Sequence, residues 1–446
     1  MRTTSTIYDA GLTRPVSRWT WKAAYAPVNI IFLYVLSTLM LFDFGPFNWN
    51  ISNSVELHVF VFASLLALYY GYHVGVSAPL KRKTVARRGV RRIHAYGAVL
   101  GSIIVIPVIY TYTGKMPWQV LEVIRDQNQA YLEMGDTLAN LLAEGSGGSR
   151  LIVASVRGLI APLSFAVIPL TILNWGRFTR RQRTLSIMFI LSCVLLSLFR
   201  GTDKEIGEIM ISTFSSALVL LARKAAARST RLKGKQIALL VVAALILVSV
   251  AGTLFVDRKQ ARLGAVDRIC VADLGDGPLT CSDVSGGSYD FAVSILASYA
   301  SHGYYGLSIA LKNDFDFSFG IGHSSFLVNQ YGLITNDLSL YRRTYLAKMA
   351  ESGWDDKAVW STVFPEIASD VSFFGVPMVM LIFGYLWGSA WKRAVRQSDD
   401  YALVFFSIMM VFMFYIPANN QIAQTADGYF SFWVWLMLSG VLTRSK

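Results

Sequence analysis

Apolar runs long enough to cross a bilayer recur along the whole chain. A helix needs about 20 mainly apolar residues to cross the hydrocarbon layer. Runs near this length can be marked at about ten places, which are 24–44, 55–78, 93–112, 151–175, 185–199, 206–222, 236–256, 371–391, 401–417 and 429–443. The pattern predicts one all-α polytopic membrane domain over 1–446. The pair 185–199 and 206–222 fits least well, because the first run is short and the second begins with polar residues.

The segments between these runs alternate in charge. Most of the 41 Lys and Arg fall in 1–23, 79–92, 176–184, 223–235, 392–400 and 444–446. The positive-inside rule places these segments and both termini in the cytoplasm. The first apolar run is too long for the apolar region of a cleavable signal peptide, so we interpret it as a retained anchor.

Two segments on the opposite, periplasmic side are long enough to carry function. Segment 113–150 starts with apolar residues at helical spacing and then breaks at EGSGGS. We expect an interfacial helix followed by a hinge. Segment 257–370, between the seventh and eighth runs, is predicted to be a large periplasmic loop.

Composition agrees with a lipid environment. The chain of 446 residues is 54% hydrophobic and only 15% charged, which excludes a soluble or a disordered protein. The formal net charge of +13 could indicate nucleic-acid binding. The basic residues sit in short loops between apolar runs, where membrane topology explains them, so we expect no nucleic-acid partner.

Cysteine usage fits the same topology. Cys193 falls inside an apolar run, whereas Cys270 and Cys281 both fall in the large loop. The periplasm is oxidising, so we expect a disulfide between the two loop cysteines. The sequence has neither a CxxC pair nor clustered histidines, and we expect no metal site.

The large loop contains an aromatic and glycine-rich stretch that is too broken for a simple transmembrane helix. Irregular backbone at membrane depth must be buried by protein or line a wet cavity, so its glycines suggest a cavity wall. Within it, His302, Tyr304 and Tyr305 offer aromatic faces and polar tips that suit sugars. An ordinary membrane interface also collects such residues.

Cationic residues on the periplasmic side suit an anionic diphosphate. A guanidinium is planar and always charged, and it can bind two oxygens at once. The sharper candidates are Arg342, Arg343 and Arg200, although solvated loop charges would look the same. Arg157, inside the fourth run, either serves function or pairs with an acidic residue. The full set of cationic candidates is Arg157, Arg200, Lys204, Arg262, Arg342 and Arg343.

A general base requires a carboxylate or histidine near the attacking hydroxyl. The candidates are His323, His302, Asp370 and Glu366. Between the last two runs, Asn419 and Asn420 begin a polar turn that could hydrogen-bond sugar hydroxyls or simply be solvated.

Four stretches together resemble a known family. ASHGYYGLSIAL, FGIGHSS, WSTVFPEIASDVSFFGVP and PANNQIAQTADGYFSFWVWL are similar to segments of the O-antigen polymerase family, the Wzy-type polymerases of oligosaccharide repeat units. The resemblance covers mainly Gly201 to Leu438. It implies a GT-C-like integral-membrane glycosyltransferase of the bacterial inner membrane that needs no metal or other cofactor.

The same resemblance implies the substrates and partners. Donor and acceptor would be oligosaccharides carried on undecaprenyl diphosphate, joined at the periplasmic face into O-antigen, the polysaccharide of lipopolysaccharide. A chain-length regulator and a flippase would be compatible partners in the same membrane.

The mechanism expected from these parts is a direct transfer. His323 or Asp370 would take the proton of an acceptor hydroxyl, which attacks the anomeric carbon of the donor, while Arg342 and Arg343 hold the departing diphosphate. Two alternatives stay open. An O-antigen ligase would share the donor and the topology, and a flippase should show internal repeats, which this sequence lacks.

Overall fold

The computed structural model describes residues 21–80, 87–125, 147–226, 249, 252–253, 255–260, 263, 266–271, 280–285, 287–354 and 359–440. The membrane-type helices are α1 (Trp21–Phe44), α2 (Ser54–Ser77), α3 (Arg87–Thr113), α6 (Gly147–Asn174), α7 (Arg180–Arg200), α8 (Lys204–Ala226), α14 (Val363–Arg396), α15 (Asp400–Phe414) and α16 (Ala426–Ser439). Shorter elements are η1 (Pro117–Gln119), α4 (Val120–Arg125), η2 (Trp175–Arg177), β1 (Arg268–Val271), β2 (Thr280–Asp283), α10 (Ser288–Ala310), α11 (Ser325–Thr335), α12 (Ser339–Arg342) and α13 (Tyr345–Glu351).

Among these described helices, seven are long and apolar enough to cross a membrane, namely α1, α2, α3, α6, α7, α8 and α14. The chain is therefore an all-α, multi-pass membrane protein, as the apolar runs predict. The doubtful runs 185–199 and 206–222 form the full-length helices α7 and α8. The runs 401–417 and 429–443 form the shorter α15 and α16, and most of 236–256 lies outside the described residues.

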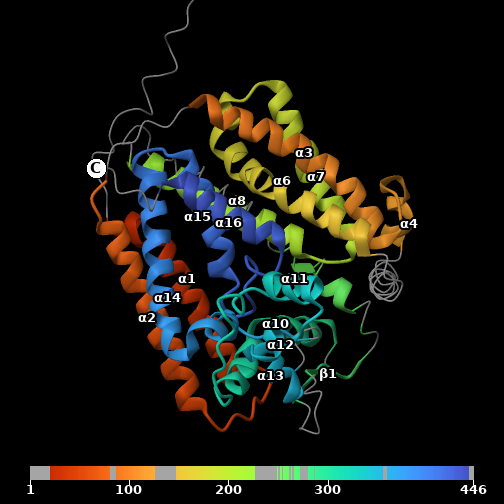
Figure 1. Cartoon of the computed structure of the whole chain (residues 1–446), viewed down its shortest axis with the longest axis vertical. Helices are drawn as coiled ribbons and strands as arrows, with labels where there is room; N and C mark the ends of the chain where they lie inside the picture. Colours follow the sequence, from red (N-terminus) through yellow and green to blue (C-terminus); the bar gives the residue numbers. More distant parts are fainter. Residues whose placement is uncertain are drawn as a thin grey trace, which may run out of the picture.

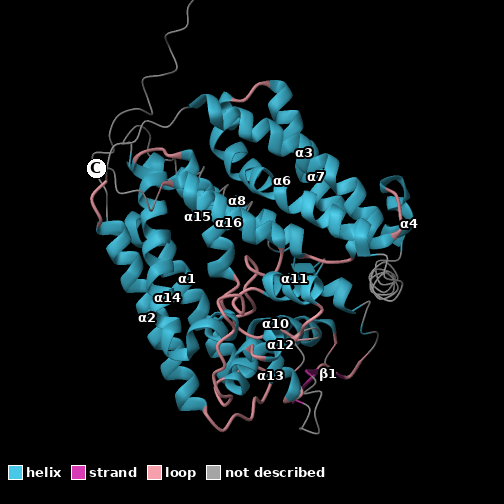
Figure 2. Cartoon of the chain, viewed as in Figure 1, coloured by secondary structure: helices cyan, strands magenta, loops and turns pink. Residues whose placement is uncertain are grey.

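The helices form two groups with a cap beneath them. Figure 1 shows α1, α2 and α14 on one side and α3, α6 and α7 on the other, with α8, α15 and α16 between them. The cap consists of the described residues from 266 to 362, and Figure 2 shows that it is mainly helical with one small hairpin at its edge. Helix α15 contacts members of both groups, and nearly all of its side chains are buried.

Helices α2 and α14 pack with their backbones almost touching. Gly71 and Gly75 on α2 face Gly384 and Gly388 on α14. A Cβ atom at Gly384 would lie 2.1 Å from the carbonyl oxygen of Leu68, so no larger residue fits without separating the helices. Small residues four apart let transmembrane helices approach this closely. This packing fixes α14 in the bundle.

Helix α14 is kinked where it passes from the cap into the bundle. Ser372 has a φ of 59°, which is not helical. The sequence predicts the eighth apolar run from 371, but the helix begins earlier, at Val363. The start is different because the first part, which carries the polar residues Glu366, Ser369 and Asp370, is also helical and lies in the cap. The kink therefore places Asp370 at the junction of cap and bundle.

The cap reaches into the bundle through α10. The hydroxyl of Tyr304 on α10 lies 2.8 Å from the hydroxyl of Thr38, which is inside α1. Strands β1 and β2 pair antiparallel, with Cys270 opposite Cys281, and a disulfide joins the two cysteines. The hairpin is attached to α10, since the hydroxyls of Ser282 and Ser294 are 2.7 Å apart.

The described part of segment 113–150 forms η1, α4 and the start of α6. In α4, Val123 is buried while Leu121 and Ile124 are exposed, as an amphipathic helix requires. Residues 126–146 lie outside the described part of the chain. The predicted hinge at EGSGGS needs a correction, because α6 begins at Gly147 within it. Glycine is tolerated in this first helical turn, where it does not interrupt a longer run.

Candidate functional site

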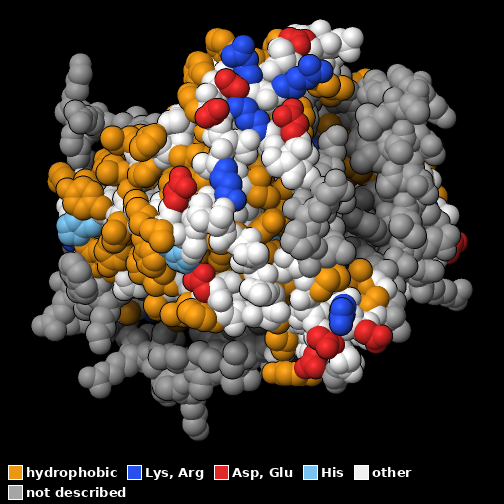
Figure 3. Space-filling view, turned by 90° about the horizontal axis from the view of Figure 1, so that it is seen from below, with side chains coloured by type: hydrophobic (Ala, Val, Ile, Leu, Met, Phe, Trp, Pro, Cys, Tyr) orange, Lys and Arg blue, Asp and Glu red, His pale blue; other side chains and the backbone are white. Residues whose placement is uncertain are grey.

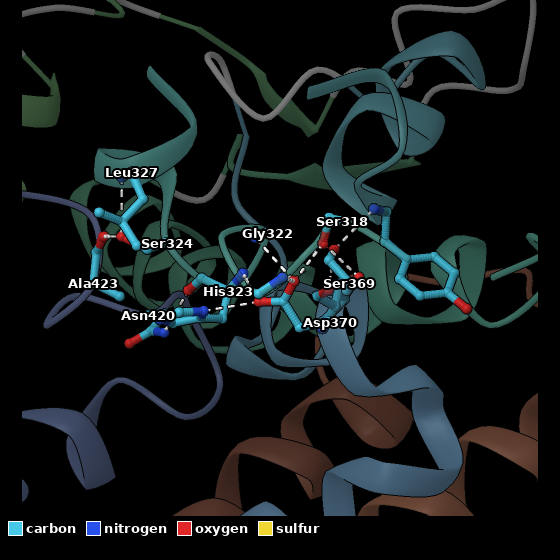
Figure 4. A network of polar contacts seen from close by, with 12 residues as sticks. Ser318, Gly322, His323, Ser324, Leu327, Ser369, Asp370, Asn420 and Ala423 are labelled. Atoms are coloured by element: carbon cyan, nitrogen blue, oxygen red, sulfur yellow. Dashed lines mark hydrogen bonds and ion pairs between the residues drawn. The ribbon is translucent and has the colours of Figure 1, made fainter. Parts of the chain in front are cut away.

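A short loop after α10 wraps around the carboxylate of Asp370. The backbone N–H groups of Gly320, Gly322 and His323 donate to this carboxylate at 3.0, 3.1 and 2.9 Å. The hydroxyl of Ser318 donates at 2.5 Å. Figure 4 shows Ser318, Gly322 and His323 converging on Asp370 at the end of the cap portion of α14.

The glycines of the sequence FGIGH make this loop sterically feasible. Gly320 has a φ of 81°, a left-handed conformation that glycine adopts without strain. A Cβ atom at Gly322 would lie 2.0 Å from the Ser318 hydroxyl oxygen. Both glycines are thus required for the backbone to approach the carboxylate.

The ring of His323 completes the arrangement. Its Nδ1 atom lies 2.8 Å from Oδ2 of Asp370. An ionised carboxylate only accepts hydrogen bonds, so Nδ1 carries the hydrogen, and in the neutral form of the ring Nε2 is the acceptor. The His323 side chain is 32% exposed, whereas that of Asp370 is 9% exposed. Nε2 has no hydrogen-bond partner among the described residues. An oriented, accessible imidazole of this kind can act as a general base.

A second carboxylate connects the His323 loop to the turn before α16. Glu366 is buried, and its Oε1 atom accepts from the backbone N–H of Asn420 at 2.8 Å. The Asn420 amide group donates to the backbone carbonyl of His323 at 3.1 Å. The Ser324 hydroxyl donates to the carbonyl of Ala423 at 2.7 Å. Three segments that are distant in sequence therefore meet at His323.

The structure brings Arg343 to the same loop. Its guanidinium lies 5.4 Å from the centre of the Phe319 ring. The segment that follows it is fixed beside the site, because the backbone N–H of Tyr345 donates to the Ser369 hydroxyl at 3.0 Å. Arg342 is exposed at the end of α12. Arg343 is thus in direct contact with the loop that binds Asp370, and Arg342 precedes it in sequence.

The other predicted cations occupy a different region. Nε of Arg157 lies 2.5 Å from Oδ2 of Asp427, and Nη1 of Arg200 lies 2.6 Å from Oε1 of Glu205. Arg157, Glu205 and Asp427 line a cavity of about 110 Å³ between α3, α6, α7, α8 and α16. The sequence allowed two interpretations of Arg157, a functional role or pairing with an acidic residue, and the structure shows the acidic partner, Asp427. Lys204 begins α8, and Arg262 lies outside the described residues.

The prediction of a sugar-binding surface at His302, Tyr304 and Tyr305 requires correction. His302 is 4% exposed and Tyr304 is fully buried. The ring of Tyr305 packs against that of Trp354 at 5.1 Å. Burial lowers the pKa of His302 to about 4, which keeps its ring neutral. These side chains form the packing of the cap, so we leave them out of the proposed site.

Sequence reasoning missed several partners of the site. Ser318 and the backbone of Gly320 and Gly322 are its main donors, and the ring of Tyr429 lies 6.1 Å from that of His323. The alternating glycines before His323 were a usable signal, since such loops present backbone N–H groups to an anion. Asn419 precedes Asn420 in the same turn, and its Oδ1 atom is buried without a hydrogen-bond partner among the described residues.

Comparison with family models, curated proteins and solved structures found no match to this chain. Within the described ranges, no group of three or more His, Cys, Asp or Glu side chains is placed to hold a metal ion.

Proposed function

We propose that this protein is a membrane glycosyltransferase that polymerises oligosaccharide repeat units carried on undecaprenyl diphosphate, at the periplasmic face of a bacterial inner membrane. The observation that carries the proposal is the Asp370–His323 pair, which leaves one imidazole nitrogen accessible at the junction of cap and bundle. The resemblance of the surrounding motifs to O-antigen polymerases supplies the reaction class.

In this proposal His323 is the general base. Asp370 fixes the ring with the hydrogen on Nδ1, so Nε2 takes the proton of an acceptor sugar hydroxyl. The hydroxyl oxygen then forms a bond to the anomeric carbon of the donor glycan. The bond between that carbon and the diphosphate oxygen breaks, and undecaprenyl diphosphate leaves with the electron pair. The glycan is thereby transferred onto the acceptor unit, and the proton ends on His323.

The cations stabilise the negative charge that develops on the leaving diphosphate. Arg343 is the best placed, because its guanidinium contacts the loop that binds Asp370 and is itself exposed. Arg342 is adjacent and also exposed. A preorganised cation at the position where charge develops is worth about 3 kcal/mol in the transition state. Arg157 and Arg200 are less suitable, since each is already paired with a carboxylate.

Surface polysaccharide in a deletion strain tests this proposal. The strain is complemented with wild type, His323→Ala, Arg343→Ala or the control His58→Gln, and protein amounts are compared by blot. We expect wild type and the control to restore the ladder of chain lengths on a gel, and His323→Ala to leave a single repeat unit on lipid A. Accumulation of long undecaprenyl-linked chains would favour a ligase instead, and an unchanged ladder in the deletion strain would refute both.

A further inference from the structure

The segment that leads into the Asp370 loop has an alternating pattern. Residues 314–318 lie outside the helices and strands, and aromatic and polar residues alternate in their sequence, DFDFS. Asp316 and Ser318 are held by polar contacts with the protein. Phe315 and Phe317, in contrast, are exposed.

The polar residues of this segment are anchored to the protein. Nζ of Lys348 lies 2.8 Å from the carboxylate of Asp316, and it donates to the backbone carbonyl of Asp314 at 2.5 Å. The backbone N–H of Ser318 donates to the backbone carbonyl of Ser369 at 3.4 Å. These contacts hold the segment in one orientation beside the start of the bundle portion of α14.

The phenylalanines at this segment are left exposed. Phe315, Phe317 and Phe319 are all exposed, and the rings of Phe317 and Phe319 lie 5.2 Å apart. Phe319 is 62% exposed although Arg343 lies over its ring. Three exposed phenylalanines in a loop that is otherwise tightly bonded are unfavourable in water.

The segment is hydrogen-bonded to α14 close to a stripe of exposed apolar residues. Just beyond the kink, Val371, Phe374, Met378 and Ile382 are exposed at helical spacing, and Phe374 is 99% exposed. In a transmembrane helix such a stripe faces lipid. The backbone bond from Ser318 to Ser369, two residues before Val371, holds the loop at the cap end of this stripe.

The space-filling view agrees with this arrangement. Figure 3 looks at the molecule from the cap end, and hydrophobic side chains gather on the flank where α2 and α14 lie in Figure 1, whereas charged side chains collect away from it. The cap end is thus apolar toward lipid on the side of α14.

We propose that Phe315, Phe317 and Phe319 insert into the cap-side leaflet of the lipid bilayer. Aromatic side chains prefer the membrane interface, and a guanidinium beside them suits the level of the lipid phosphates. The loop therefore anchors the cap to the membrane surface with Arg343 at phosphate depth. The Asp370–His323 pair, held by the same loop, lies at the boundary between lipid and water. This inference does not depend on the reaction that the site performs.

Spin labels in liposomes test the insertion. Single cysteines are introduced as Phe315→Cys and Phe317→Cys in the full chain with Cys193→Ser, and each is labelled with a nitroxide. Phe374→Cys provides the lipid-exposed reference, and Glu351→Cys, at the exposed end of α13, provides the water-exposed reference. Relaxation by oxygen, which partitions into lipid, is compared with relaxation by a water-soluble nickel chelate.

We expect both loop labels to show a ratio of oxygen to nickel accessibility several-fold above that at Glu351 and close to that at Phe374. A ratio like that at Glu351 would overturn the proposal, because the phenylalanines would then face water. Low accessibility to both reagents with an immobilised spectrum would also overturn it, since protein and not lipid would cover the loop. Two label positions are used so that the result does not depend on one variant folding.

Discussion

Two polar regions lie on either side of the first turn of α16, and they are built differently. On one side, Asp427 pairs with Arg157 beside a cavity within the helix bundle. On the other side, Tyr429 lies against the ring of His323, which is bonded to Asp370. The first region matches each of the cations Arg157 and Arg200 with a carboxylate. The second leaves an imidazole nitrogen accessible.

The difference separates charges that hold helices together from groups that can react. A guanidinium paired with a carboxylate inside a bundle avoids the cost of an isolated charge in lipid, but little of its charge is left for a ligand. In contrast, Asp370 is saturated with donors while the ring that it orients is 32% exposed. We therefore assign chemistry to the His323 side and helix association to the Arg157 side.

The largest expected effect is at His323. Replacing it with alanine removes the proposed general base, and we expect polymerisation to fall about 100-fold or more, the usual contribution of such a group. The rate of glycan extension by purified protein in liposomes measures this. The control His58→Gln changes a histidine of α2 that is bonded to Asp43, and should retain activity. Equal losses of activity in both variants would contradict the assignment of His323 as the general base.

His302 offers a buried histidine without a proposed reaction. Because its pKa in the folded protein is about 4, below the ordinary 6.5, the unfolded chain binds a proton more readily. Folding stability is therefore intact above pH 6.5 and should decrease by about 3 kcal/mol as the pH falls to 4. Thermal unfolding of wild type and His302→Gln at pH 7 and pH 4 measures this loss of stability. If the variant loses as much stability as wild type between the two pH values, other titratable groups cause the acid sensitivity.

The sequence predicts some parts of this arrangement better than others. The apolar runs locate the long helices, because span length depends only on local hydrophobicity. His323 and Asp370 could be named as candidates, but their pairing joins residues 47 positions apart and depends on a loop conformation that only Gly320 and Gly322 hint at. Tyr304 was misjudged because an aromatic residue in a loop looks the same whether it contacts a sugar or packs against Thr38.

Arg343 should have a smaller effect than His323. It is exposed, so water screens part of its charge and it contributes less than the roughly 3 kcal/mol of a fully preorganised cation in a dry site. We expect Arg343→Ala to lower the rate of polymerisation about 10-fold, or about 1.4 kcal/mol in the barrier. Arg342→Ala is the matched comparison, because it removes the same charge from a position without a contact to Phe319. The rates of glycan extension by the two variants are compared in the same liposome assay. A larger loss in Arg342→Ala would mean that the diphosphate lies on the other side of α12.

The smallest effect, and the sharpest test of the contrast, is the coupling between Arg157 and Asp427. We expect each of Arg157→Gln and Asp427→Asn to lower the thermal unfolding midpoint, because each leaves one charge unpaired in the bundle. The double variant should recover part of the loss, with a coupling of about 1 kcal/mol. Unfolding of the four proteins in the same detergent gives this value.

The double variant also separates the two roles by activity. If the pair only joins α6 to α16, the double variant should polymerise glycan at close to the wild-type rate once it is folded to the same extent, since His323 and its partners are unchanged. If it is as stable as wild type but inactive, the cavity beside Arg157 contacts the substrate. The two polar regions would then form one site that extends across the first turn of α16.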